Sequence, residues 1–273
     1  MDQGGQTAAN DSSRALLELR GVSKHFGPVQ SLTDVNMSAP SGMVTALVGD
    51  NGAGKSTLVK CIAGIHSPDD GGHIYFDGKE VTMKSPKDAA SHGIETVYQD
   101  LALCDNLDIV QNMFLGRELR KGLFLDEDAM ENAAKETLAS LSVTTIRSIR
   151  QPVASLSGGQ RQAVAVAKAV MWNAKLVIMD EPTAALGVAQ TKMVLELVRT
   201  LADRGLGVII ISHNMNDVFK VADRIAVLRL GRMVAEDRSD KFDRQIIVDL
   251  MTTGVSTRAR SEDALSGAEG GAH

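Results

Sequence analysis

Short apolar runs of strand length recur along the chain, with polar or glycine-rich stretches after them. The clearest are residues 44–48, 176–179 and 208–211, each of four or five mostly apolar residues. Continuous runs of this length are typical of strands that are buried on both faces of a sheet. A helical stretch at residues 55–63 follows the first run, and Gly64 is placed to end it. The pattern predicts an α/β fold with a mostly parallel sheet flanked by helices.

A second pattern, alternation of apolar and polar positions, predicts antiparallel strands. Residues 16–20 and 31–38 alternate, and residues 73–78 form a strand that ends in a turn. Near the other end of the chain, a hairpin is predicted to turn at Leu230 and Gly231. We therefore expect an antiparallel β subdomain beside the parallel sheet.

Helical periodicity replaces the strand pattern between about residues 101 and 171. Asp126 can cap a helix that runs through Leu141 with one apolar face. A helix rich in alanine and valine follows at residues 159–171, and a further helix is predicted at residues 189–203. The block at 101–171 predicts a helical subdomain inserted into the α/β core.

The first apolar run leads directly into a complete phosphate-loop motif. Residues 49–56 match G-x-x-x-x-G-K-[ST]. The glycines let backbone N–H groups turn inward around an anion, and the following helix N-terminus adds partial positive charge. Lys55 is then placed for the β- and γ-phosphates of ATP, and the Ser56 hydroxyl for Mg²⁺. A chance glycine-rich turn is disfavoured, because the complete motif lies between a predicted strand and a predicted helix. The predicted nucleotide-binding residues are Gly49, Asp50, Asn51, Gly52, Ala53, Gly54, Lys55, Ser56 and Thr57.

Two acidic residues, Asp180 and Glu181, follow the apolar run at 176–179. The carboxyl ends of parallel strands share one edge of the sheet, so these acids should lie near the phosphate loop. Asp180 is the expected partner of Mg²⁺, and Glu181 is the expected general base or water-positioning group. An acidic pair alone is more simply a solvated strand end. With a complete phosphate loop upstream, a site that binds ATP and Mg²⁺ is favoured.

A second glycine-rich stretch lies between these motifs, formed by Ser157, Gly158, Gly159 and Gln160. Ser157 supplies a hydroxyl, the glycines allow close backbone approach, and the predicted helix points its N-terminus at an anion. With these motifs in this order, residues 16–253 resemble the ATP-binding subunit of an ATP-binding cassette (ABC) transporter. The resemblance implies a P-loop nucleoside triphosphatase core with an antiparallel β subdomain and an inserted helical subdomain.

The resemblance also implies that the ATP site is shared between two subunits. In the family, the stretch at residues 157–160 of one subunit binds the γ-phosphate held by the partner's phosphate loop. Gln99 resembles the family's Gln that contacts Mg²⁺ and the attacking water, His213 the switch His at the γ-phosphate, and Phe26 the aromatic that stacks on adenine. Outside this context, each of the three is more simply a loop or core residue. The implied catalytic residues are Lys55, Gln99, Glu181 and His213, and the implied Mg²⁺ ligands are Ser56, Gln99 and Asp180.

Three further segments resemble the branch of the family that serves importers of monosaccharides such as ribose and fructose. They are residues 112–118, 181–190 and 212–215. One position departs from the family pattern, because Gly187 stands where many members have an Asp that bridges to the other subunit. We therefore expect the bridge that this Asp makes between subunits to be missing. The stretch at residues 157–160 should then carry a larger share of the contact between subunits.

Composition narrows the classes of function. The formal net charge is −5, which disfavours a surface that coats nucleic acid. The two cysteines, Cys61 and Cys104, indicate a reducing compartment and no disulfide framework. The apolar runs are too short to span a membrane, and residues 1–13 lack the pattern of a secretory signal. We therefore expect a peripheral protein at the cytoplasmic face of the cell membrane, held there by a partner.

The sequence as a whole predicts one ABC ATP-binding domain at residues 15–254, between disordered tails at 1–14 and 255–273. The cassette motifs occur once, so a homodimer, or a paired cassette subunit, should supply the second site. The expected function is ATP hydrolysis that drives a separate membrane permease, which an extracytoplasmic binding protein supplies with a monosaccharide. Import of another small solute remains an alternative. A soluble ABC ATPase acting on nucleic acid or ribosomes, or a non-catalytic subunit, is disfavoured by the acidic charge and the complete set of motifs.

Overall fold

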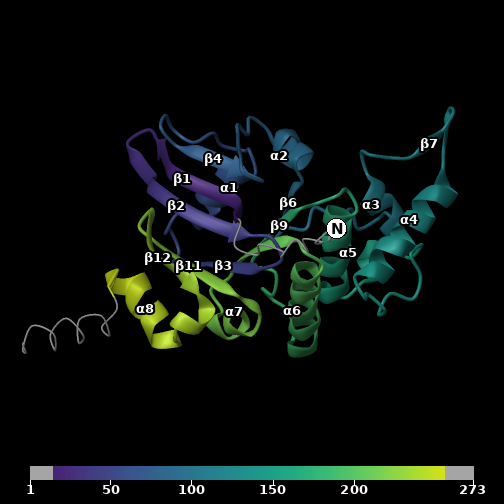
Figure 1. Ribbon diagram of the computed structural model, residues 1–273. Coiled ribbons are helices and arrows are strands. Elements are labelled where there is room, and N and C mark those ends of the chain that lie inside the picture. The colour runs from purple at the N-terminus through teal and green to yellow at the C-terminus, as the bar shows by residue number, and fades with distance from the viewer. Residues whose placement is uncertain (1–14, 256–273) are drawn as a thin grey trace, which may run out of the picture.

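Two main β-sheets, a short two-stranded sheet and the helices around them make up the computed structural model, which describes residues 15–255 (Figure 1). The larger sheet has the strand order β12-β11-β3-β10-β9-β6, and all its neighbouring pairs are parallel except β11 and β12. Its strands are β3 (Val44–Val48), β6 (Ile94–Val97), β9 (Leu176–Asp180), β10 (Gly207–Ile211), β11 (Arg224–Arg229) and β12 (Arg232–Arg238). The predicted parallel sheet is therefore confirmed, as is the hairpin that turns at Leu230 and Gly231.

The strands at the centre of this sheet are covered on both faces. In β3, Ala46 and Val48 pack into the cluster formed with the helices, while Leu47 packs into the cluster formed with the second sheet. The same alternation recurs in β9, where Val177 and Ile178 face opposite clusters. This two-sided burial explains why these strands appear in the sequence as continuous apolar runs.

The second sheet is antiparallel, with the strand order β2-β1-β4-β5. It consists of β1 (Ala15–Phe26), β2 (Val29–Pro40), β4 (His73–Phe76) and β5 (Lys79–Val81). The predicted pairing is confirmed, but β1 and β2 extend beyond the predicted ranges, to a turn between Phe26 and Val29. Register irregularities interrupt the alternation of buried positions in this extension, so its sequence does not show a strand pattern.

Helices fill the space between the sheets and cover the outer face of the larger one. In Figure 1, α1 lies between the sheets, and α6, α7 and α8 lie on the side of the larger sheet away from β1 and β2. These elements are α1 (Lys55–Ile62), α2 (Pro86–His92), α6 (Val188–Asp203), α7 (Met215–Val221) and α8 (Arg244–Thr253). The predicted helices after the phosphate loop and after the paired acids are confirmed.

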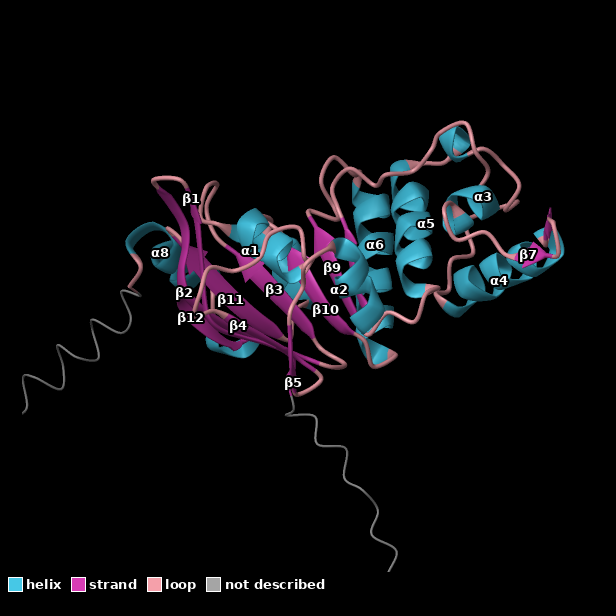
Figure 2. Ribbon diagram, turned by 90° about the horizontal axis from the view of Figure 1, so that it is seen from above, coloured by secondary structure: helices cyan, strands magenta, loops and turns pink. Residues whose placement is uncertain are grey.

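A group of helices projects beyond the end of the larger sheet, where Figure 2 shows them to one side of the strands. The group contains α3 (Ile109–Phe114), α4 (Glu127–Ser140) and α5 (Gly158–Val170). Asp126 caps α4 as predicted, since its carboxylate accepts a hydrogen bond of 3.1 Å from the N–H of Ala129. The block is not wholly helical, because β7 (Arg120–Lys121) and β8 (Phe124–Leu125) form a short hairpin between α3 and α4. Short 3₁₀ helices lie at Val153–Ser155 and Ser239–Lys241.

Some expectations concern parts of the chain outside this description. The tails predicted to be disordered lie almost wholly outside the described residues, and the domain boundaries stay predictions. Within residues 15–255, no helix is long and apolar enough to cross a membrane. Cys61 is fully buried and Cys104 is partly buried, and both are free thiols.

Gly64 ends α1 in a geometry that only glycine fits. Its φ is +72°, and a Cβ at this position would lie 2.4 Å from the carbonyl oxygen of Ser85. The turn is completed by a hydrogen bond of 2.9 Å from the N–H of Ile65 to the carbonyl of Lys60. This closure brings the loop after α1 back against the segment that leads into α2.

We predict that Gly64→Ala lowers the free energy of unfolding by about 2 kcal/mol or more, because backbone strain and a steric clash add. The control is Gly205→Ala, since Gly205 also has a positive φ, of +88°, but a Cβ there would meet no atom within 4 Å. Urea denaturation should show a smaller loss for the control, about 1 kcal/mol. Equal losses for the two variants would contradict the steric argument.

Candidate functional site

The phosphate loop is held in shape by contacts that its glycines alone permit. A Cβ on Gly49 would lie 2.2 Å from the carbonyl oxygen of Leu228 in β11. Gly54, with a φ of +105°, begins α1, and a Cβ there would lie 2.8 Å from the carbonyl oxygen of Ser31. The loop is thus pressed between the ends of β2 and β11, and its backbone is free to face the space in front of α1.

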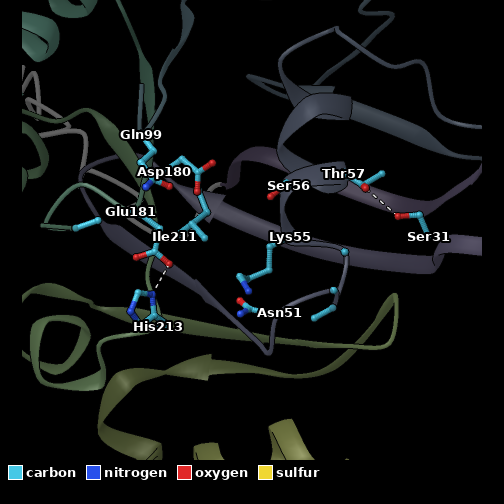
Figure 3. Close-up of a pocket in the computed structure, with 14 residues that line it drawn as sticks. Ser31, Asn51, Lys55, Ser56, Thr57, Gln99, Asp180, Glu181, Ile211 and His213 are labelled. Atoms are coloured by element: carbon cyan, nitrogen blue, oxygen red, sulfur yellow. Dashed lines mark hydrogen bonds and ion pairs between the residues drawn. The ribbon is translucent and has the colours of Figure 1, made fainter. Parts of the chain in front are cut away.

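A pocket of about 460 Å³ opens in front of this loop. Figure 3 shows Lys55 and Ser56 on one side of it, and Asp180, Glu181 and His213 on the other. The pocket brings together most of the predicted site residues from four separate segments of the chain. Its lining residues are Ser31, Asn51, Gly52, Ala53, Gly54, Lys55, Ser56, Thr57, Gln99, Asp180, Glu181, Ala184, Ile211 and His213.

Lys55 spans the mouth of the phosphate loop. Its Nζ donates hydrogen bonds of 2.6 Å to the carbonyl of Gly49 and of 3.0 Å to the carbonyl of Asp50. Partial burial lowers the pKa of the Lys55 ammonium, against the attraction of the carboxylates of Glu181, Asp50 and Asp180. The phosphates of a triphosphate bound in this pocket would stabilise the charged form of this half-buried ammonium group.

Glu181 leaves the end of β9 in a strained backbone conformation, with a φ of +49°. Its N–H donates a hydrogen bond of 2.9 Å to the carbonyl of Ile211, at the end of β10. The side chain turns into the pocket, where its Oε1 lies 2.8 Å from Nδ1 of His213. The Glu181 side chain is 17% exposed and that of His213 is 73% exposed, so the histidine closes the solvent side of the carboxylate. Strain of this kind, held by neighbouring hydrogen bonds, is characteristic of functional positions.

Asp180, the last residue of β9, is partly buried beside Glu181. Burial raises the pKa of the Asp180 carboxyl, and the nearby carboxylate of Glu181 raises it further, while Lys55 and Lys60 oppose the shift. The carboxylate is therefore held where its charge is costly without a cation. This is the environment expected of a ligand for a metal ion.

The donor groups in the pocket fit Mg²⁺. Ser56, Gln99 and Asp180 all line the pocket and offer a hydroxyl, an amide carbonyl and a carboxylate. Mg²⁺ prefers oxygen ligands and commonly takes one or two carboxylates together with water and substrate phosphates. Residues 15–255 contain no cluster of three or more His, Cys, Asp or Glu side chains that could hold a metal alone. The ligand set therefore suits an ion that enters with a nucleotide.

Ser157 begins α5 in a capping box, outside this pocket. Its Oγ accepts a hydrogen bond of 3.3 Å from the N–H of Gln160, whose Oε1 accepts one of 2.9 Å from the N–H of Ser157. A Cβ on Gly158 would lie 2.7 Å from Leu186, and one on Gly159 would lie 2.6 Å from Met193. The Ser157 hydroxyl stays exposed at the helix N-terminus while the glycines pack against the segment after Glu181. None of the four residues lines the pocket of its own chain.

Two further predicted positions lie apart from the pocket. Phe26 ends β1 with 43% of its surface exposed, and the edge of its ring meets His66 with centroids 5.1 Å apart. Gly187 begins α6 without a side-chain cap, and a Cβ there would meet no atom within 4 Å. The adenine-stacking role of Phe26 and the effect of Gly187 on a dimer stay predictions.

The pocket also contains residues that the sequence did not indicate. The Oγ of Ser31 donates a hydrogen bond of 2.8 Å to Oγ1 of Thr57, which ties β2 to the first turn of α1. Ala184 and Ile211 complete the wall near Glu181. Ser31 belongs to no sequence motif. Its hydrogen bond to Thr57 and the close approach of Gly54 to its carbonyl make it part of the site.

A phosphate loop after β3, a carboxylate at the end of β9 and a Glu–His pair lie on one edge of a parallel sheet. Together they define the site of a P-loop nucleoside triphosphatase. Comparison with known proteins makes the class more specific. The sequence pattern of the ABC transporter family matches residues 32–184. The chain belongs to this family and is one of its ATP-binding, ATP-hydrolysing subunits.

The chain is similar to several sugar import proteins. It is 50% identical to the xylose/arabinose import ATP-binding protein XylG of Sulfolobus acidocaldarius, over 87% of this chain and 94% of that protein. It is 47% identical to the fructose import ATP-binding protein FrcA of Rhizobium meliloti, again over 87% and 94%. It is 39% identical to the galactose/methyl galactoside import ATP-binding protein MglA of Salmonella typhimurium, over 95% of this chain but 50% of that protein.

Solved structures agree with the fold. A crystal structure of an ATP-binding cassette of an ABC transporter, in its ADP conformation, matches with a TM-score of 0.76 and 28% identity. The match covers 87% of this chain and 96% of that one. The predicted fold class, a P-loop core with an antiparallel sheet and added helices, is therefore confirmed.

We predict that Asp180→Asn raises the melting temperature of the nucleotide-free protein at neutral pH while it abolishes ATP hydrolysis. The folded-state pKa of Asp180 lies above its ordinary value, so at a pH above both values the ionised carboxylate destabilises the fold. Thermal melting as a function of pH checks this prediction. The gain should shrink as the pH falls through the raised folded-state pKa, and it should vanish below the unfolded-state pKa, where the carboxyl is protonated in both states. A lower melting temperature than wild type at neutral pH would contradict the argument.

Proposed function

We propose that this chain is the energy-coupling subunit of a monosaccharide importer. The observation that carries the proposal is its identity of 50% and 47% to XylG and FrcA across 94% of each, since their names specify the import of xylose, arabinose and fructose. The acidic net charge of −5 is consistent with this function and disfavours a nucleic-acid partner. Which sugar is carried would be decided by the membrane partner, as the pocket of this chain suits a nucleotide.

The site geometry supports a division of labour in ATP hydrolysis. Lys55 and the loop N–H groups hold the β- and γ-phosphates, and Ser56, Gln99 and Asp180 would hold Mg²⁺. Mg²⁺ held by these residues would supply positive charge against the phosphate oxygens. Glu181 orients the attacking water and accepts its proton, a contribution of about 10²–10⁴ in rate. His213 keeps the Glu181 carboxylate directed at the γ-phosphate position through the 2.8 Å contact.

The site becomes complete only when a second subunit contributes. Ser157 is exposed and does not line the pocket of its own chain, yet it presents a hydroxyl and a helix N-terminus that suit a phosphate. We therefore place residues 157–160 of one subunit against the γ-phosphate bound by the other, in a head-to-tail homodimer. The open space at Gly187 is consistent with a dimer contact that depends more on Ser157 than on this position.

A groove beside Gln99 suits the membrane permease. It has a volume of about 350 Å³ and lies between the end of β6 and helices α3 and α5, with Tyr98, Leu115, Arg117 and Trp172 among its lining residues. The guanidinium of Arg117 lies 5.2 Å from the centre of the Trp172 ring, and both residue types are enriched at protein interfaces. A cytoplasmic segment of the permease bound here would sense movement at Gln99, and would hold the chain at the cytoplasmic face of the membrane. An extracytoplasmic binding protein would deliver the sugar to that permease.

The shared site predicts complementation between two inactive variants. Lys55→Ala removes the phosphate-loop lysine, and Ser157→Arg blocks the loop that enters the partner's site. Each variant alone should hydrolyse no ATP, whereas a mixture should recover activity, because a mixed dimer has one site with both groups intact. The measurement is phosphate release at constant total protein. A mixture as inactive as its components would contradict the shared site.

Sugar uptake tests the function itself. The chain is purified with the membrane protein that accompanies it and reconstituted in proteoliposomes. ATP is supplied on the side of this chain, and the extracytoplasmic binding protein is supplied on the other side with radiolabelled xylose, arabinose or fructose. We expect ATP-dependent accumulation of one of these sugars and none with Glu181→Gln, which binds ATP but lacks the base. If only a different solute is taken up, the chain serves an importer of that solute, and the proposed sugar substrate is wrong. Copurification with ribosomes or nucleic acid, without a membrane protein, would contradict import.

A further inference from the structure

Asp217 is the only acidic or basic residue among the buried polar residues of the described chain, with 4% of its surface exposed. It lies on the first turn of α7, below the pocket, and does not line it. A buried carboxylate is costly unless hydrogen bonds satisfy it. The hydrogen-bond partners of Asp217 therefore indicate which part of the structure its burial stabilises.

One oxygen of Asp217 joins the two segments that carry the proposed catalytic pair. Its Oδ2 accepts a hydrogen bond of 2.9 Å from the Thr183 hydroxyl, and Thr183 is two residues after Glu181. The same Oδ2 accepts a hydrogen bond of 3.0 Å from Nδ2 of Asn214, which directly follows His213. The nearest cation, Nζ of Lys220, lies 3.9 Å from the other oxygen, Oδ1.

The segments are thus tied on two sides. On the pocket side, Oε1 of Glu181 meets Nδ1 of His213 at 2.8 Å. On the buried side, Asp217 bridges Thr183 and Asn214. Without these two contacts, the only other tie between the segments described above is the hydrogen bond of 2.9 Å from the N–H of Glu181 to the carbonyl of Ile211. Because the backbone of Glu181 is strained, the buried bridge also opposes its relaxation.

We infer that Asp217 is a positioning residue for ATP hydrolysis, whose carboxylate fixes the spacing between Glu181 and His213. This inference rests on the catalytic roles proposed above for those two residues. Asp217 touches neither the nucleotide nor the attacking water. It acts by holding Thr183 and Asn214, so its loss should affect turnover and leave nucleotide binding intact.

The direct test removes the bridge from both ends. Asp217→Ala removes the acceptor, and Thr183→Val removes the donor on the Glu181 side with little change in shape. Both should lower kcat by roughly 10- to 100-fold, since small misplacements of reacting groups have effects of this size. The Kd of trinitrophenyl-ATP, measured by fluorescence, should stay within about twofold of wild type, because the phosphate loop is untouched.

Rescue and a matched control separate positioning from stability. Asp217→Asn keeps an acceptor oxygen for both donors and should recover most of the turnover that Asp217→Ala loses. The control is Asp223→Ala. Asp223 accepts hydrogen bonds of 2.8 Å from the N–H of Val44 and of 2.7 Å from Arg199, away from both catalytic segments. Its loss should lower the melting temperature without lowering kcat at temperatures where the protein stays folded.

The outcomes distinguish this inference from the proposed function. Wild-type turnover in both Asp217→Ala and Thr183→Val would overturn the inference, as would losses that follow melting temperature as in Asp223→Ala. Glu181→Gln is measured beside them. If that variant keeps full turnover, the proposed base is wrong. If Glu181→Gln is inactive while Asp217→Ala and Thr183→Val have normal turnover, the positioning role of Asp217 is wrong and the proposed role of Glu181 stands.

Discussion

The parallel register of β3, β9 and β10 is the constraint on which the site depends. Ile211 at the end of β10 pairs with Leu47 of β3 on one side and with Asp180 of β9 on the other. The three strands therefore end at one level, and the phosphate loop, Glu181 and His213 emerge side by side. A slip of one residue would turn the buried side chains of a strand to the opposite face, so two-sided burial protects this register.

The site carries costs that the core must offset. Glu181 has a left-handed backbone, Asp180 has a raised pKa, and Lys55 is a half-buried ammonium with a lowered one. Each of these features suits a nucleotide and a metal ion better than the protein alone. Such departures from local preference are expected at functional sites, where ligand binding restores the balance.

Much of this arrangement could be predicted from the sequence, because it rests on local patterns. The buried strands, the phosphate loop and the paired acids each occupy one short segment. Contacts between distant segments could not be predicted in this way. Ser31 belongs to the site through its packing against Gly54 and its hydrogen bond to Thr57. Asp217 matters because folding brings Thr183 to it. The extension of β1 and β2 was missed because its register irregularities hide the strand pattern.

In the proposed dimer, each chain holds half of each ATP site, and ATP joins the two chains. Light scattering of the Glu181→Gln variant tests this arrangement, because the variant is expected to retain ATP without hydrolysing it. With ATP and Mg²⁺, we expect a species of twice the mass of the 29.0 kDa chain, and without nucleotide we expect the mass of a single chain. A mass that stays at the monomer value with saturating ATP, in a protein whose wild type hydrolyses ATP, would contradict it.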